Sequence, residues 1–150
     1  MSEHKAIITW KRTSPDFLKG RYSREHTWVF DGGATVHASP APSVVPPPMS
    51  NPAFVASLSS CHMLTFLFVA QKKGFVVESY RDESVGTMAK NEKGVPFVSA
   101  VILRPEIVFS GDKMPEQADL DQMHHLAHEQ CYIANSVITK VTVEPPKTNP

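Results

Sequence analysis

The sequence of 150 residues lacks an excess of charge of either sign, because 15 lysines and arginines balance 15 aspartates and glutamates. This balance argues against a broad electrostatic attraction to nucleic acid or anionic lipid, so we expect small or uncharged partners. The N-terminus also lacks an apolar signal region, which predicts a cytoplasmic protein. No internal repeat is present, and the length suits one ordinary domain.

Cysteine is scarce, and Cys61 and Cys131 are the two cysteines of the chain. In the cytoplasm a permanent structural disulfide is disfavoured, whereas a transient, catalytic one is permitted. The two residues lie 70 positions apart, and this spacing alone does not say whether they meet. Two separate core thiols are therefore the plain alternative to a reactive pair.

One long segment, from Asn51 to Gly74, is apolar on every side. A helix of this kind is buried. Asn51 suits its start, Lys72 and Lys73 complement the negative end of the helix dipole, and Gly74 can take the left-handed conformation that ends it. A membrane span is the rival interpretation, but a polar band of serines and His62 near the middle argues against it.

Alternation of apolar and polar residues predicts β-strands on both sides of this helix. The predicted strands cover 5–11, 25–30, 34–38, 75–90, 95–109 and 137–143. A second helix is predicted to open near Pro115 and to carry Cys131. The Asp31-Gly32-Gly33 sequence predicts a hairpin turn, and Pro105 predicts an edge strand or a bulge.

Hairpin-connected strands with helices between them predict an α+β domain over residues 1–150, with an antiparallel sheet that wraps the long buried helix. Six prolines within residues 40–52 predict an extended crossing segment before that helix, and residues 145–150 are predicted to be a loose tail. One sheet face and one helix cannot cover a helix that is apolar all round. A second copy of the chain is therefore expected to cover its other side, as a homodimer.

Histidines of the second predicted helix offer an alternative chemistry. His124, His128 and Cys131 fall at i, i+4 and i+7 on one helix face, with His125 and His62 as further options, which is a spacing that metal sites use. Histidines on an exposed helix face are commonly only solvated. We therefore expect no metal site here.

The contexts of the two cysteines carry a resemblance to a known family. The segments FVASLSSCHML (54–64), AHEQCYIANSV (127–137) and SREHTWVFDGG (23–33), together with the strand order, resemble the family of osmotically inducible protein C and organic hydroperoxide resistance protein, the OsmC/Ohr family, in its OsmC-like subgroup. The similarity runs over nearly the whole chain. It implies an OsmC-like fold, an intertwined homodimer whose two sheets wrap two central helices, and the activity of a thiol peroxidase.

The resemblance also implies roles for single residues. Cys61 matches the family's peroxidatic cysteine and Cys131 its resolving cysteine. The family uses an arginine near the N-terminus to stabilise the thiolate, and Arg24 matches it best, with Arg21 as the alternative. A neighbouring cation of this kind increases the thiolate fraction of a cysteine.

The implied cycle has two chemical steps and needs no resident cofactor. The Cys61 thiolate attacks a peroxide oxygen to give a sulfenic acid, and Cys131 condenses with it to a disulfide. A small external dithiol, such as a lipoyl group, then reduces this bond. The apolar surroundings of Cys61 predict alkyl or fatty-acid hydroperoxides as substrates rather than hydrogen peroxide. The predicted substrate-binding residues are Phe54, Leu58, Met63 and Leu64.

One departure from the family pattern bears on activity. Relatives usually have a glutamate shortly before the central helix that holds the arginine, whereas here the chain runs from Met49 directly into Ala53 without it. Glu25 or Glu83 would have to replace that carboxylate. The alternative hypothesis is a non-catalytic relative that keeps the fold as a binding module for an apolar ligand.

Overall fold

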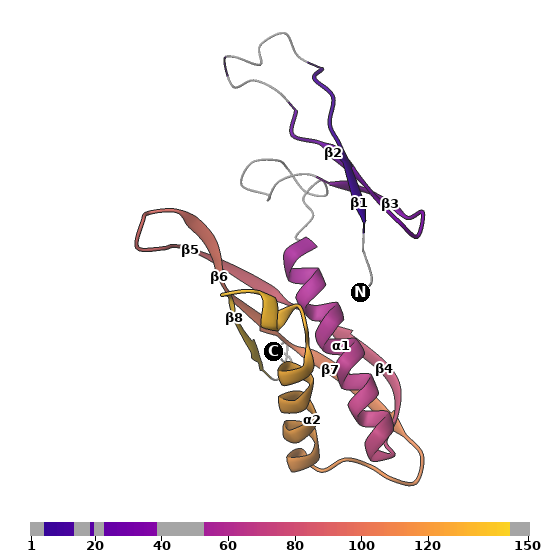
Figure 1. Ribbon diagram of the computed structural model, residues 1–150. Coiled ribbons are helices and arrows are strands. Elements are labelled where there is room, and N and C mark those ends of the chain that lie inside the picture. The colour runs from indigo at the N-terminus through magenta and orange to yellow at the C-terminus, as the bar shows by residue number, and fades with distance from the viewer. Residues whose placement is uncertain (1–4, 14–18, 20–22, 39–52, 145–150) are drawn as a thin grey trace, which may run out of the picture. The chain divides into compact units, whose positions relative to one another are not determined.

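The computed structural model describes residues 5–13, 19, 23–38 and 53–144 (Figure 1). The chain forms two compact units, Met1–Pro52 and Ala53–Pro150, and each is described by itself. The proline-rich segment predicted over 40–52, including the predicted helix start at Asn51, and the tail predicted over 145–150 lie outside the described residues.

The first unit contains a three-stranded antiparallel sheet. Its strands are β1 (Ala6–Thr9), β2 (His26–Phe30) and β3 (Thr35–Ala38), with β2 in the centre. The hairpin turn predicted at Asp31-Gly32-Gly33 is confirmed: Gly33 has a φ of 86°, and its N–H donates to the carbonyl of Phe30 over 2.9 Å. A left-handed residue at this point favours glycine because it has no Cβ.

Within residues 53–144, the second unit forms two helices and five strands. The helices are α1 (Ala53–Lys73) and α2 (Gln117–Gln130), and a 3₁₀ turn, η2 (Ala134–Ser136), follows α2. The strands are β4 (Val76–Asp82), β5 (Val85–Lys90), β6 (Pro96–Leu103), β7 (Pro105–Ser110) and β8 (Lys140–Val143). The two helices pack against each other and run antiparallel (Figure 1).

The end of α1 follows the local signals of the sequence. Gly74 has a φ of 80°, and the N–H of Phe75 donates to the carbonyl of Ala70 over 3.0 Å, which is the bond of a Schellman motif. The ammonium of Lys113 donates to the carbonyl of Lys73 over 2.6 Å, so this carbonyl in the last turn of α1 also has a hydrogen-bond partner. The predicted helix end is therefore confirmed.

The prediction of two long strands is wrong, because each is broken in two. Residues 75–90 divide into β4 and β5, and residues 95–109 divide into β6 and β7. Asp82 lies at the break between β4 and β5, and Arg104 lies at the break between β6 and β7. The Asp82 carboxylate accepts a hydrogen bond from the backbone N–H of Arg104 over 2.7 Å, so the two breaks are joined to each other. It also accepts the hydroxyls of Ser59 (2.5 Å) and Ser84 (2.6 Å), which ties both breaks to α1.

These breaks create two sheets in the second unit. One pairs β4 with β7, and the other has the order β5-β6-β8. Pro105 lies in β7, whose one hydrogen-bonded neighbour among the described strands is β4, as expected for an edge strand. The α+β class is confirmed, but antiparallel pairing has one exception: β6 and β8 are parallel, because the chain returns to β6 through β7 and α2.

Two hydrophobic clusters hold these layers together. The first joins α1, α2 and the β4–β7 sheet through Phe66, Val69, Ala70, Phe75, Met123 and Ala127. The second joins the first half of α1 to β6 through Leu58, Val101 and Leu103, with Ile133, Val137 and Val141 packed around them. The cysteine of α1 lies between Leu58 of one cluster and Phe66 of the other.

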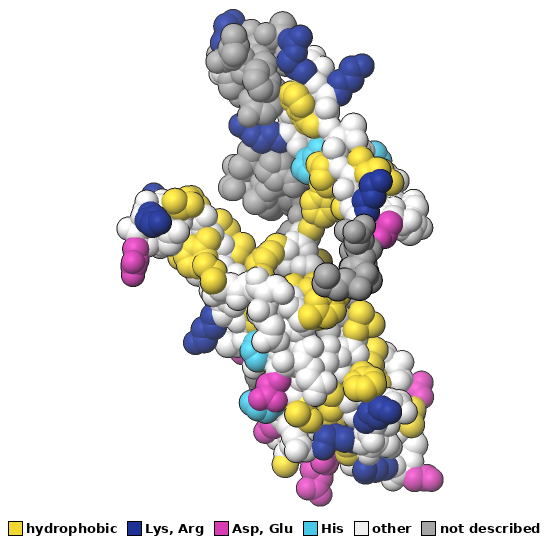
Figure 2. All heavy atoms as spheres, in the orientation of Figure 1, with side chains coloured by type: hydrophobic (Ala, Val, Ile, Leu, Met, Phe, Trp, Pro, Cys, Tyr) yellow, Lys and Arg dark blue, Asp and Glu magenta, His cyan; other side chains and the backbone are white. Residues whose placement is uncertain are grey.

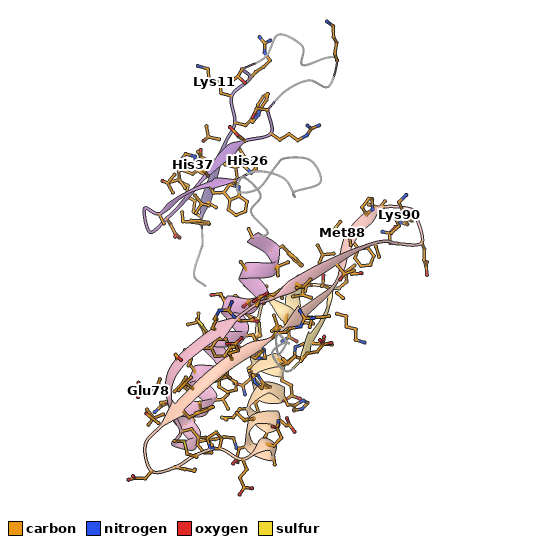
Figure 3. The ribbon with its side chains drawn as sticks, turned by 180° about the vertical axis from the view of Figure 1, so that it is seen from behind. Lys11, His26, His37, Glu78, Met88 and Lys90 are labelled. Carbon is orange, nitrogen blue, oxygen red and sulfur yellow. The ribbon has the colours of Figure 1, made fainter. Side chains whose placement is uncertain are left out.

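Only one stripe of α1 is buried within the chain. Leu64 and Phe68, on the other side, keep 59% and 55% of their surface exposed. Large hydrophobic residues are also exposed on the β5–β6 hairpin, where Figure 2 shows them at the surface and Figure 3 labels Met88, 61% exposed. These exposed apolar residues agree with the reason for which the sequence predicts a homodimer. The homodimer itself stays a prediction.

By length and composition, α1 is the one helix among the described residues that could cross a membrane. It packs on α2 and β4, and it buries the polar residue His62 to 1% exposure. We therefore interpret α1 as the core helix of this unit.

Candidate active site

The structure brings the two cysteines together. Cys61 lies within α1 and Cys131 caps the C-terminus of α2, and the two sulfurs are 2.6 Å apart. Both are free thiols, and they keep only 4% and 1% of their surface exposed. Because the antiparallel helices face each other at this level, a bond between the sulfurs requires little backbone movement.

The surroundings of Cys131 keep its thiol protonated. Burial, and then the hydrogen bond to Cys61, raise the pKa of Cys131 to about 11. The backbone N–H of Ala134, 3.4 Å from its sulfur, opposes this only in part. The negative end of the α2 dipole also disfavours a thiolate at a C-cap. Cys131 therefore stays protonated at neutral pH and donates its S–H to the sulfur of Cys61.

A pair of histidines joins the same two helices. His62 Nε2 and His124 Nδ1 are 3.0 Å apart, so one ring donates and the other accepts. Burial, followed by the nearby His124 and His128, lowers the pKa of His62 to about 4, although Asp82 acts in the opposite direction. Burial also lowers the pKa of His124. The pair is therefore neutral at pH 7.

Tyr80 and Asp82 extend this polar region along β4. The Tyr80 hydroxyl is buried without a hydrogen-bond partner among the described residues. Burial, and then the charge of Asp82, raise the pKa of Tyr80, so its phenol stays neutral. The Tyr80 ring packs against Phe66, with ring centroids 5.8 Å apart. These groups form the floor of the α1–α2 contact rather than a second reactive centre.

Described residues of this unit line two hollows that bear on the site. The larger, about 730 Å³, lies between β7 and α2, and His124 forms part of its wall. The smaller, about 410 Å³, lies at the start of α1, and its apolar walls are Phe54, Phe97, Val98, Val137 and Ile138. We call the smaller one the Phe54 groove.

The structure places the predicted substrate-binding residues in different surroundings. Phe54 lines the Phe54 groove, whereas Leu58 is 1% exposed and belongs to the second hydrophobic cluster. Met63 is half-buried, and Leu64 lies on the exposed side of α1. Phe54, Leu58 and Cys61 follow one another at i, i+4 and i+7, so they share one side of the helix.

The predicted arginine belongs to the first unit, which is described by itself. Arg24 precedes β2, and its carbonyl accepts the Nδ1 proton of His26 over 2.8 Å. The alternative, Arg21, lies outside the described residues. Glu83, a candidate for the missing family glutamate, forms a 3.0 Å ion pair with Arg81. The roles of Arg24 and of Glu25 therefore stay predictions.

The metal-binding spacing on α2 does not assemble a site in the described part of the chain. His124 is bonded to His62, and Cys131 contacts Cys61. No group of three histidine, cysteine or acidic side chains suited to a metal ion occurs in residues 5–13, 19, 23–38 and 53–144. From the sequence, His62 was predicted only as a possible metal ligand. Its hydrogen bond to His124 was not predicted.

Comparison with known proteins gives a consistent family assignment. The sequence profile of a family described as OsmC-like protein matches residues 48–145. An OsmC-like protein of unknown function from Vibrio cholerae O1 biovar eltor is 54% identical, with a TM-score of 0.89 over 97% of this chain and 99% of that one. Among curated proteins there is no match.

More distant structures share the fold. The organic hydroperoxide resistance protein of Elizabethkingia anophelis is 16% identical, with a TM-score of 0.69 and 97% of each chain covered. The organic hydroperoxide resistance protein OhrB of Bacillus subtilis is 15% identical, with a TM-score of 0.63 and 97% of each chain covered. Identities this low show a common fold and nothing finer.

Proposed function

Since the chain belongs to the OsmC-like protein family, we propose that it is a thiol peroxidase that reduces organic hydroperoxides through Cys61 and Cys131. The observation that carries this proposal is the 2.6 Å contact between two buried thiols that come from different helices. Two solved structures that share this fold are named organic hydroperoxide resistance proteins, but at their identities the likeness concerns the fold, so the cysteine pair carries the proposal.

The proposed cycle begins at Cys61. Its thiolate attacks the terminal oxygen of the hydroperoxide, the O–O bond breaks, and the alkoxide takes up a proton and leaves as the alcohol. The thiol sulfur is oxidised by two electrons to a sulfenic acid. Cys131 then attacks the Cys61 sulfur, water leaves, and a disulfide forms. An external dithiol, with a lipoyl group as the candidate, returns both cysteines to thiols by exchange.

The protonation of Cys131 supports this assignment of roles. A thiol with a pKa of about 11 has almost no thiolate at pH 7, so it does not compete for the peroxide. Its sulfur lies 2.6 Å from that of Cys61, which is the position a resolving thiol needs. From the family resemblance, we assign thiolate stabilisation by a cation to Arg24.

We further propose that the protein acts in the cytoplasm as a homodimer. The exposed apolar residues of α1 and of the β5–β6 hairpin support this assembly, since isolated chains rarely expose so many large apolar side chains together. No membrane and no nucleic acid enters the proposed function.

Two cysteine variants test the proposal. Cys61→Ser should abolish consumption of cumene hydroperoxide. Cys131→Ser should react once and stop with Cys61 as a sulfenic acid, which dimedone traps and mass spectrometry locates. If wild type and both variants consume the peroxide equally slowly, the peroxidase assignment fails and the binding module for an apolar ligand takes its place.

An arginine variant tests the proposed cation. Arg24→Ala should slow the first step at about pH 7 much more than at about pH 9, because a cation matters most where few thiols are ionised. Stopped-flow measurement of thiol loss at both pH values gives the ratio. An equal slowing at both would assign Arg24 to structure rather than to thiolate stabilisation.

A further inference from the structure

The Phe54 groove is lined without a single charged side chain among the described residues. Its walls are Phe54, Phe97, Val98, Val137 and Ile138, joined by two hydroxyl residues. A volume of about 410 Å³ lies within the range of small-molecule sites. The groove is therefore suited to a small apolar body.

Both hydroxyl groups of the groove donate their protons to the protein itself. Ser136 Oγ donates to the carbonyl of Tyr132 over 2.7 Å, and Thr139 Oγ1 donates to the carbonyl of Val98 over 2.7 Å. No side-chain proton donor remains among the lining residues for an anionic ligand. A carboxylate that entered the groove would lose water without gaining a side-chain donor among the described lining residues, and this loss is costly.

The Phe54 groove lies near Cys61 and Cys131, because residues that line the groove also pack close to the two cysteines. Val98 and Val137 line it and also pack against the cluster that contains Leu58, one helical turn before Cys61. On the other side, Ser136 belongs to the same 3₁₀ turn as Ala134, whose N–H lies 3.4 Å from the Cys131 sulfur. A ligand in the groove therefore lies beside the walls that enclose the two sulfurs.

We propose that the Phe54 groove holds the organic part of the substrate and selects uncharged hydroperoxides over those that carry a carboxylate. This inference rests on the proposed function and narrows its substrate class. Ile138, 86% exposed at the rim, determines the specificity together with Phe97. The apolar residues around Cys61 in the sequence predict alkyl or fatty-acid hydroperoxides as substrates, whereas the groove separates the uncharged ones from those with a carboxylate.

A matched pair of substrates tests the selectivity. Linoleic acid hydroperoxide and its methyl ester share the same chain and differ in one charge at about pH 7. We expect kcat/KM for the ester to exceed that for the acid by about tenfold or more. Ile138→Lys supplies a cation at the rim and should reduce this ratio by about threefold or more, whereas Ile138→Asp should increase it.

The control is Tyr132→Lys, which adds the same charge to the same loop outside the groove. Tyr132 is 74% exposed and does not line the groove, so the ratio should not change. A ratio near one in wild type, or equal shifts in the Ile138 and Tyr132 variants, would overturn the inference while peroxidase activity stands.

Failure of the proposed function has a different signature. Neither substrate would then be consumed faster by wild type than by Cys61→Ser. In that case calorimetric titration of wild type with the corresponding hydroxy acid and its methyl ester tests the groove alone. Tighter binding of the ester, reversed in part by Ile138→Lys, supports the groove. Equal binding of acid and ester overturns it.

Discussion

The buried imidazole of His62 should make the stability of the protein depend on pH. Its pKa is about 4 in the native protein and about 6.5 in the unfolded chain, so between these values the unfolded chain binds a proton that the native protein does not. The free energy of unfolding therefore falls as the pH falls through this window. From pH 7.5 to pH 5, His62 alone should remove about 2 kcal/mol.

Burial sets the sign of this effect, and the groups that face His62 modify its size. His124 and His128 on α2 oppose a second positive charge, and Asp82 on β4 favours one but does not outweigh burial. The test is urea unfolding at about pH 7.5 and pH 5, at constant protein concentration, for wild type and His62→Gln. The glutamine does not titrate, so the loss between the two pH values should shrink by about 2 kcal/mol.

His125 provides the matched control for this measurement. Its side chain is exposed and pairs with Glu129 over 3.2 Å on the outer face of α2. His125→Gln removes an exposed imidazole instead of a buried one, so the change in pH dependence caused by His62→Gln should exceed the change caused by His125→Gln. If His62→Gln and wild type lose the same free energy on acidification, the argument from burial is refuted.

Three further outcomes follow from the packing. Gly86→Ala should destabilise the fold by about 1 to 3 kcal/mol in urea unfolding, because a Cβ there would lie 2.6 Å from the stiff side chain of Val55; Gly32→Ala, with nothing within 4 Å, should change little. Asp82→Ala should cost about 1 to 3 kcal/mol by the same assay, because the partly buried N–H of Arg104 loses its acceptor; an unchanged midpoint would contradict this role. Light scattering at micromolar concentration should give a dimer, and a folded monomer would refute the proposed assembly.

Local signals predicted the parts of the fold that depend on neighbouring residues. The C-terminus of α1 rests on Gly74 and the lysines before it, and the first hairpin rests on Gly33. The strand breaks could not be predicted in this way. They depend on the bond from Asp82 to the N–H of Arg104, which lies 22 positions away in the sequence. The alternation of apolar and polar residues continues through a break of this kind, so it does not reveal where one strand ends and the next begins.

In the candidate site, too, the sequence predicted the residue types but not the contacts between distant residues. Residue type and family resemblance singled out Cys61 and Cys131, but only the tertiary fold shows that their sulfurs touch. The bond between His62 and His124 spans 62 positions and has no local signal. Leu58 was predicted from its closeness to Cys61 in the sequence, and it does share a side of α1 with Cys61, but there its side chain is packed into the second hydrophobic cluster.

The separation of the two cysteines along the chain has a consequence for the lifetime of the protein. Under the proposed cycle, oxidation closes residues 61–131 into a covalent ring that contains β4 to β7 and α2. A ring whose two cysteines are 70 positions apart restricts the unfolded chain and raises the free energy of unfolding by about 4 kcal/mol in the chain-entropy account. Cellular proteases act largely on transiently opened chains, so the oxidised form would be degraded more slowly than the reduced form. Peroxide stress would then increase the amount of this protein in the cell without any new synthesis.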